Sequence, residues 1–406
     1  MGHPDAYIFH PTCELAVASG IHYYQPNKRL QQFEQDLQFM PVFLSRPGDW
    51  ILLSEESVIP EGFYEDLGWG ERVWRDISSL KNDVESGNVL NSLGRLKPWG
   101  WSPQMHHRLE FLKPFCKSEF EAGKMGEWNP KLSSFYSRHF SRLFLQKLYE
   151  QIGHYSWVDQ KIQPTICFQP EEVRRLLDSH GKLMLKAPFS SSGRGLQKLS
   201  KPNWHSYHQQ WTESILRSQG SVMVEPLLDK VADFAFQFYI HEDKRIEFYG
   251  RSFFQTDSNG KYQGNFLGGW PESMNSEIYD QLPYDFMDTV FRGIKTVLIE
   301  SRLPDNYSGP LGIDAMIYRD QEGQLKVQPC LEINLRYTMG FVALEIEKRL
   351  GRHKKGMMQL YYDRGVPFEN FIRKKTPGKI GDFKEIKALT PFRNMSKFGL
   401  WMGLYD

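Results

Sequence analysis

The segment LEINLRY (Leu331–Tyr337) decides how this sequence is interpreted. It places Glu332, Asn334 and Arg336 at two-residue spacing. On a β-strand, side chains at that spacing emerge on one face. A carboxylate, an amide and a guanidinium on one buried face would be costly without a ligand. The pattern therefore indicates a binding site on a sheet, with a solvated polar face as the alternative.

A second segment, GIDAMIY (Gly312–Tyr318), places Asp314 in an otherwise apolar strand. If that strand neighbours the first, then Asp314, Glu332 and Asn334 form a set of hard oxygen donors. Such a set suits Mg²⁺, which keeps water and phosphate oxygens as its remaining ligands. Arg336 beside them fits a negative charge that develops during a reaction.

The stretch KAPFSSSGRG (Lys186–Gly195) has the composition of a phosphate-binding loop but not the order of a known one. Its Lys precedes the glycines and a further strand follows, so it is neither a Walker A loop nor a GxGxxG fingerprint. A Ser/Gly turn between two strands can still close over phosphates with its backbone N–H groups. Lys186 then supplies a point charge. A flexible hairpin turn is the alternative.

A third polar feature lies in VMVEPLLDKVADFAFQF (Val222–Phe238), where Glu225 ends an apolar strand just before a proline. Such a strand end can offer adenine a hydrogen-bond acceptor and backbone groups. Asp233 follows at a distance from which a carboxylate could hold two ribose hydroxyls. A charged linker is the alternative interpretation.

In this order, over residues 140–350, the motifs resemble those of the ATP-grasp superfamily. The resemblance implies ATP and Mg²⁺ as cofactors, with a glycine-rich flap that includes Ser191, Ser192 and Gly193. It implies that Lys186 contacts the phosphates, that Glu225 and the Leu227 backbone hold adenine, and that Asp233 holds the ribose. It also implies two magnesium ions on Asp314, Glu332 and Asn334, and a catalytic role for Arg336 on an acyl phosphate.

The sequence departs from the family pattern in one place. SRLFLQKLYEQIG (Ser141–Gly153) matches the helix before the flap, but Arg142 stands where a phosphate-contacting Lys is usual. Arginine keeps the charge with a different geometry. In FYGRSFFQT (Phe248–Thr256), Arg251 lies on a strand that often carries a basic phosphate contact, and we expect it to be catalytic.

The first hundred residues alternate between strand and helix patterns. AYIFH (Ala6–His10), MPVFL (Met40–Leu44) and DWILL (Asp49–Leu53) are predicted strands, and the intervening NKRLQQFEQDLQFM has helical spacing. This order predicts a small α/β unit with a parallel sheet. HPTCELAVASG and KPWGWSP resemble a group of uncharacterised bacterial proteins, which implies no substrate.

The predicted fold class is mixed α/β and α+β. An ATP-grasp fold of two α+β subdomains that clasp ATP follows a small N-terminal α/β domain. We expect four segments: an N-terminal domain (1–115), a central subdomain (116–182), a flap and metal-binding subdomain (183–350) and a C-terminal extension (351–406).

Composition limits the partners. The 406 residues contain 50 Lys and Arg against 49 Asp and Glu, a formal net charge of +1, which gives no support to a nucleic-acid or membrane partner. The four cysteines have no CxxC spacing, which argues against a disulfide framework and a zinc site. No signal peptide and no membrane span is recognised, so we expect a cytoplasmic protein. The oligomeric state is not readable from the sequence.

The first functional hypothesis is an ADP-forming ligase that joins a small-molecule or peptide carboxylate to an amine. The second is a kinase-like phosphotransferase that acts on a small molecule. The third is a catalytically inert nucleotide-binding adaptor, against which the intact acidic set argues.

Overall fold

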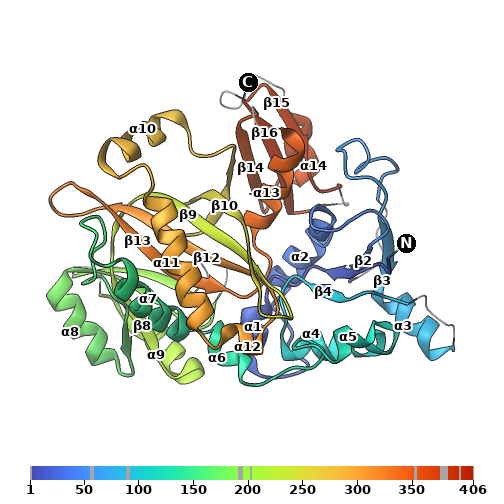
Figure 1. The fold of residues 1–406 in the computed structure, drawn as a ribbon, viewed down its shortest axis with the longest axis horizontal. Coiled ribbons are helices and arrows are strands. Elements are labelled where there is room, and N and C mark those ends of the chain that lie inside the picture. Colours follow the sequence, from blue (N-terminus) through green and yellow to red (C-terminus); the bar gives the residue numbers. More distant parts are fainter. Residues whose placement is uncertain are drawn as a thin grey trace. The chain divides into compact units, whose positions relative to one another are not determined.

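The computed structural model describes residues 2–54, 59–87, 92–190, 195–201, 204–351, 354–374, 383–392 and 395–405. The chain forms two compact units, and neither is continuous in sequence (Figure 1). Unit 1 contains Met1–Trp128, Gln263–Gly269 and Arg336–Asp406. Unit 2 contains Asn129–Tyr262 and Trp270–Leu335. The four-segment division remains a prediction.

Unit 1 contains a parallel sheet with the strand order β3-β2-β1-β4. Its strands are β1 (Ala6–Ile8), β2 (Trp50–Leu53), β3 (Val73–Asp76) and β4 (Leu96–Pro98). The helices beside them are α1 (Cys13–Ser19), α2 (Lys28–Asp36), α3 (Ile77–Glu85), α4 (Pro103–Arg108) and α5 (Ser118–Glu121), with a 3₁₀ helix at Glu110–Phe115. The parallel pairing of β1 with β2 and with β4 confirms the predicted α/β unit.

The segment from Met40 to Leu44 is not the strand that the sequence suggested. Met40–Phe43 forms a 3₁₀ helix with Pro41 in its first turn. All four residues are buried. A short apolar run does not distinguish a buried strand from a buried helical turn, and proline favours the first turn of a helix because its missing N–H needs no partner there.

Unit 1 also contains antiparallel strands in the order β11-β14-β16-β15. These strands are β11 (Tyr262–Leu267), β14 (Gly356–Tyr362), β15 (Glu385–Ala388) and β16 (Phe398–Leu404), accompanied by helices α13 (Met339–Leu350) and α14 (Phe368–Lys374). The buried Asp36 carboxylate of α2 accepts the backbone N–H groups of Lys397 and Phe398 at 2.9 and 3.0 Å. This contact ties α2 to the start of β16.

The longer strands of unit 2 pair antiparallel in the order β13-β12-β9-β10. These strands are β9 (Asp229–Ile240), β10 (Ile246–Thr256), β12 (Gly309–Arg319) and β13 (Leu325–Asn334). Helices α7 (Arg138–Ile152) and α11 (Phe286–Glu300) pack against each other. Figure 1 shows α11 lying over these strands. Phe234 and Phe238 of β9 contact Phe286 and Phe291 of α11, so one face of these strands is a buried apolar face. The shorter helices are α6 (Leu132–Tyr136), α10 (Glu272–Gln281) and α12 (Leu303–Asn306).

A smaller antiparallel sheet of unit 2 has the order β5-β8-β6-β7. It contains β5 (Thr165–Cys167), β6 (Lys182–Lys186), β7 (Leu196–Ser200) and β8 (Val222–Pro226), with helices α8 (Pro170–His180) and α9 (Ser206–Gln219). Leu183, Leu185 and Val224 lie in its buried core, with Val173 and Leu177 of α8. Successive side chains of β6 point to opposite faces of the sheet, and Leu183 and Leu185 point into this core. Lys186, the next residue, therefore emerges on the other face.

No helix in the described part of the chain is both long enough and apolar enough to cross a membrane.

Candidate functional site

Asp314 and Glu332 are direct cross-strand partners in the β12–β13 ladder. Direct partners in an antiparallel pair carry their side chains on the same face. Asn334 lies two residues after Glu332, and its Nδ2 donates to Asp314 Oδ2 at 3.2 Å. The three side chains that the sequence singled out from these two strands therefore share one face of the sheet.

The chemistry of this donor set fits a hard cation. It offers two carboxylates and one amide oxygen, the ligand types that Mg²⁺ takes. Among the described residues, no three His, Cys, Asp or Glu side chains form a group that could hold a metal ion. A cation at this face would therefore depend on Asn334 and on oxygens from phosphate or water.

Arg138, the first residue of α7, is the cation that contacts this set. Its Nη2 lies 2.7 Å from Glu332 Oε1, and its Nη1 donates to the Ala187 carbonyl and the Ser190 hydroxyl at 2.6 Å each. The side chain is 6% exposed. One guanidinium thus links the acidic set to the segment that follows β6.

The sequence pattern points to Arg142, one helical turn later, rather than to Arg138. Arg142 Nε instead donates to the Pro164 carbonyl at 2.8 Å. The available signal was the i, i+4 spacing, which puts both arginines on one side of the helix. Ser137 caps the helix through the His139 N–H. The Arg138 N–H donates to the Pro188 carbonyl at 2.9 Å, so the first turn of the helix lies against the segment that follows β6.

Lys186 and Glu225 form an ion pair between β6 and β8, with 2.8 Å between Nζ and Oε1. Their side chains are 10% and 8% exposed. Burial of both charges is tolerated because each is paired. The cation expected at the phosphates and the carboxylate expected at adenine are therefore neighbours.

The buried thiol of Cys330 on β13 is under the electrostatic influence of both sets of charges. Burial is the main cause that raises its pKa above the ordinary value. The charges that also act on it come from Asp314, Lys186, Glu225 and Glu332. Coulombic influence falls with distance. The acidic set and the Lys186–Glu225 pair therefore lie within electrostatic reach of one sulfur.

The Asp233 carboxylate and the Leu227 backbone, both expected to contact the nucleotide, already bind other groups of the protein. Lys230 Nζ lies 2.6 Å from Asp233 Oδ2, and the Thr256 hydroxyl donates to the same oxygen at 2.9 Å. Burial raises the pKa of Asp233, and Lys230 opposes that shift. The Leu227 N–H donates to the Lys182 carbonyl at 3.1 Å. Both polar groups have protein partners.

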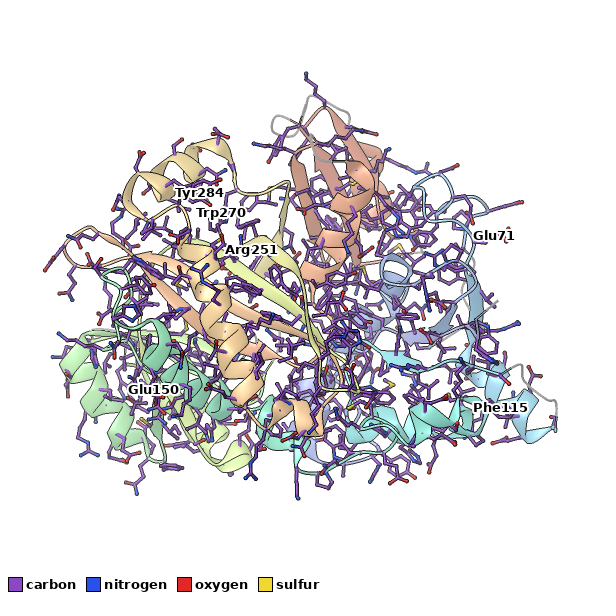
Figure 2. All side chains as sticks on the ribbon, in the orientation of Figure 1. Glu71, Phe115, Glu150, Arg251, Trp270 and Tyr284 are labelled. Atoms are coloured by element: carbon purple, nitrogen blue, oxygen red, sulfur yellow. The ribbon has the colours of Figure 1, made fainter. Side chains whose placement is uncertain are left out.

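The strand register separates Arg251 from the acidic set. Arg251 of β10 pairs with Phe236, whereas Asp314 pairs with Ala235, and neighbouring residues of β9 face opposite sides of the sheet. Figure 2 labels the position of Arg251. Its guanidinium binds Asp288 of α11. Its expected contact with the reacting groups is therefore not what this geometry provides.

Arg336 follows the end of β13 and belongs to unit 1. Its Nε donates to Glu14 of the same unit. Ser191, Ser192 and Gly193 of the expected flap lie outside the described residues.

No protein-family model and no curated protein matches the sequence. The fold is similar to that of solved enzymes. The ADP complex of an N5-carboxyaminoimidazole ribonucleotide synthetase is 9% identical, with a TM-score of 0.50 over 100% of this chain and 93% of that chain. A biotin carboxylase–βγ-ATP complex from Campylobacter jejuni is 11% identical, with a TM-score of 0.50 over 100% of this chain and 88% of that chain. These two likenesses confirm the predicted ATP-grasp fold.

Proposed function

We propose, from the ATP-grasp fold that this chain adopts, that it is an ADP-forming ligase that joins a carboxylate to an amine. The observation that carries the proposal is the direct pairing of Asp314 with Glu332 on one sheet face, next to Arg138. Two carboxylates at one site are costly unless cations compensate them. The two similar solved structures were determined with ADP and with βγ-ATP, which supports a nucleotide as the anionic partner.

Asp314, Glu332 and Asn334 would hold Mg²⁺. The metal would supply charge neutralisation on the phosphate oxygens. Arg138 has a different task, because it already fixes one oxygen of Glu332 and the chain at Ala187 and Ser190. It would keep the carboxylate oriented and hold the end of β6 in place.

Lys186 would contact the phosphates and Glu225 the adenine amino group. The ammonium has three donors, so it can bind a phosphate oxygen and keep Glu225 as a partner. Asp233 would accept hydrogen bonds from the ribose hydroxyls while its carboxylate keeps its contacts with Lys230 and Thr256. Arg336 would stabilise negative charge on the reacting acyl group.

The reaction has two steps. A substrate carboxylate oxygen attacks the terminal phosphorus of ATP, and the bond to the bridging oxygen breaks, which yields an acyl phosphate and ADP. The amine nitrogen then attacks the acyl carbon, phosphate leaves, and the nitrogen loses its proton to solvent or to phosphate. The protein contributes positioning and charge compensation, as in other phosphoryl transfers.

A screen of carboxylate and amine pairs by phosphate release, with product mass measured, tests the proposal. The ligase predicts ADP and phosphate in equal amounts and a condensed product of the expected mass. A phosphorylated product without any amine would indicate the phosphotransferase instead. Tight ATP binding with no ADP formation from any pair would indicate the inert adaptor.

A further inference from the structure

The parallel sheet of unit 1 has one position where the direction of winding reverses. In the order β3-β2-β1-β4, the chain proceeds from β1 to β2 and β3 on one side and then adds β4 on the other. In open α/β sheets, the carboxyl ends of the strands at such a reversal form the crevice in which ligands bind. In unit 1 this position lies between the ends of β1 and β4.

A segment of the chain's own backbone lies at the end of β4. The Tyr337 N–H donates to the Trp99 carbonyl at 2.7 Å, and Gly100 and Arg336 form an antiparallel bridge. A Cβ atom on Gly100 would lie 2.9 Å from Arg336 Cβ and 2.4 Å from Cys13 Sγ. Only glycine permits this approach, and the Arg336 backbone is held in place by it.

Glu14 holds the other end of the arginine. It lies in the first turn of α1, directly after β1, and is 3% exposed. Arg336 Nε donates to Glu14 Oε1, and the Cys13 thiol donates to Glu14 Oε2 at 3.2 Å. The Arg336 side chain is 13% exposed. Both carboxylate oxygens are engaged, so the guanidinium has little freedom to swing.

We propose that the crevice at this reversal serves to position Arg336, with Glu14 as the positioning residue that orients its guanidinium for the reaction. The inference rests on the proposed function, because Arg336 is the residue assigned to the developing charge. Arg336 follows Asn334 by two residues, so an anchor on α1 is covalently continuous with the metal-binding strand. Glu14 thereby takes part in catalysis through an arginine that lies 322 positions later in the sequence.

Glu14→Gln tests the role in the full-length protein, because it keeps the shape and removes the charge. We expect kcat for ADP formation to fall about 100-fold, while the KM for ATP stays within about threefold, because a misplaced catalytic group affects the reaction step. Gly100→Ala should act in the same direction by displacing Arg336. Asp36→Asn is the matched control, a carboxylate of unit 1 that is 2% exposed and accepts hydrogen bonds from Gln32 and from the start of β16.

A second measurement does not need activity. In ¹⁵N-arginine-labelled wild type, with the signal assigned from Arg336→Lys, the Arg336 Nε–H should exchange slowly with water, and Glu14→Gln should accelerate it. Fast exchange in the wild type overturns the anchor, whatever the activity. Slow exchange with an unchanged kcat in Glu14→Gln overturns the positioning role. Slow exchange with no ADP formation from any substrate pair overturns the proposed function and, with it, the catalytic purpose of the anchor.

Discussion

Lys186 and Glu225 form an ion pair between neighbouring strands, 2.8 Å apart and only 10% and 8% exposed. Removing one partner of a buried pair leaves a charge without compensation, which costs about 3–5 kcal/mol. We therefore expect Lys186→Met to lower the free energy of unfolding by that amount. It should also weaken MgATP binding by about 10- to 100-fold, because a hydrogen bond to a charged group contributes roughly 1.5–3 kcal/mol. Chemical denaturation and nucleotide titration measure the two effects.

The double variant Lys186→Met with Glu225→Leu separates stability from binding. Replacing both charges by apolar groups of similar volume is often close to neutral for stability. Stability should return while MgATP affinity stays low. Wild-type affinity in the double variant would remove Lys186 from the nucleotide site.

Glu332→Gln and Asp314→Asn should each abolish magnesium-dependent turnover while the fold persists. We expect a loss of about 100-fold or more, because charge stabilisation by the cation contributes several kcal/mol. Turnover measured against Mg²⁺ concentration gives the result. Glu277→Gln is the control, because Glu277 also pairs with an arginine, Arg319, but is 43% exposed. Equal activity in all three variants would make the two site carboxylates structural.

Arg138 and Arg142 provide a comparison within one helix. Arg138→Lys loses the planar group that reaches Ala187, Ser190 and Glu332 together, so we expect at least about a tenfold loss in kcat/KM. Arg142→Lys loses one bond to the Pro164 carbonyl and should stay within about threefold of wild type. Steady-state kinetics of both variants measure the two losses in kcat/KM. A larger loss in Arg142→Lys than in Arg138→Lys would support Arg142 as the phosphate contact.

His106 makes stability depend on pH. Burial against Trp101, with a smaller effect from Lys113, lowers its pKa from 6.5 to about 3. Between these values the unfolded chain binds a proton that the folded protein does not, so stability falls as pH decreases from about 6.5. The slope from this group reaches about 1.4 kcal/mol per pH unit.

Urea unfolding between pH 7 and pH 5 measures this dependence. His106→Phe should flatten it, because phenylalanine keeps the contact with Trp101 and does not titrate. The neighbouring His107, half-exposed and 3.5 Å from Glu110, supplies the control His107→Gln, which should follow the wild type. An unchanged slope in His106→Phe would assign the pH dependence to other groups.

The face shared by Asp314, Glu332 and Asn334 was predictable because two-residue alternation fixes sides within a strand. The side on which Arg251 lies was not. Phe248 pairs with Phe238 and Gly250 with Gln237, so β10 carries one extra residue between them. Without this bulge, Arg251 would pair with Ala235 and face the acidic set. A one-residue shift moves every later side chain to the other face.

Ion pairs between residues far apart in the chain could also not be predicted from the sequence. Glu14 precedes Arg336 by 322 positions, and no local pattern in HPTCELAVASG indicates that its carboxylate receives an arginine. Which of Arg138 and Arg142 contacts the acidic set depends on which end of α7 packs against the end of β6. Local alternation predicted strands and their faces, whereas tertiary packing determined the pairing of charges.

The interrupted composition of unit 1 has a consequence for synthesis on the ribosome. Its parallel strands emerge first, but β14 and β16 follow only after all of unit 2 has been made. Domains that are continuous in sequence fold in the order in which they are translated. Here the unit whose synthesis begins first is the last to be completed. Until then, the Asp36 carboxylate lacks the backbone N–H groups at the start of β16 that it binds. In the nascent chain, unit 1 therefore stays incomplete for the time needed to translate unit 2.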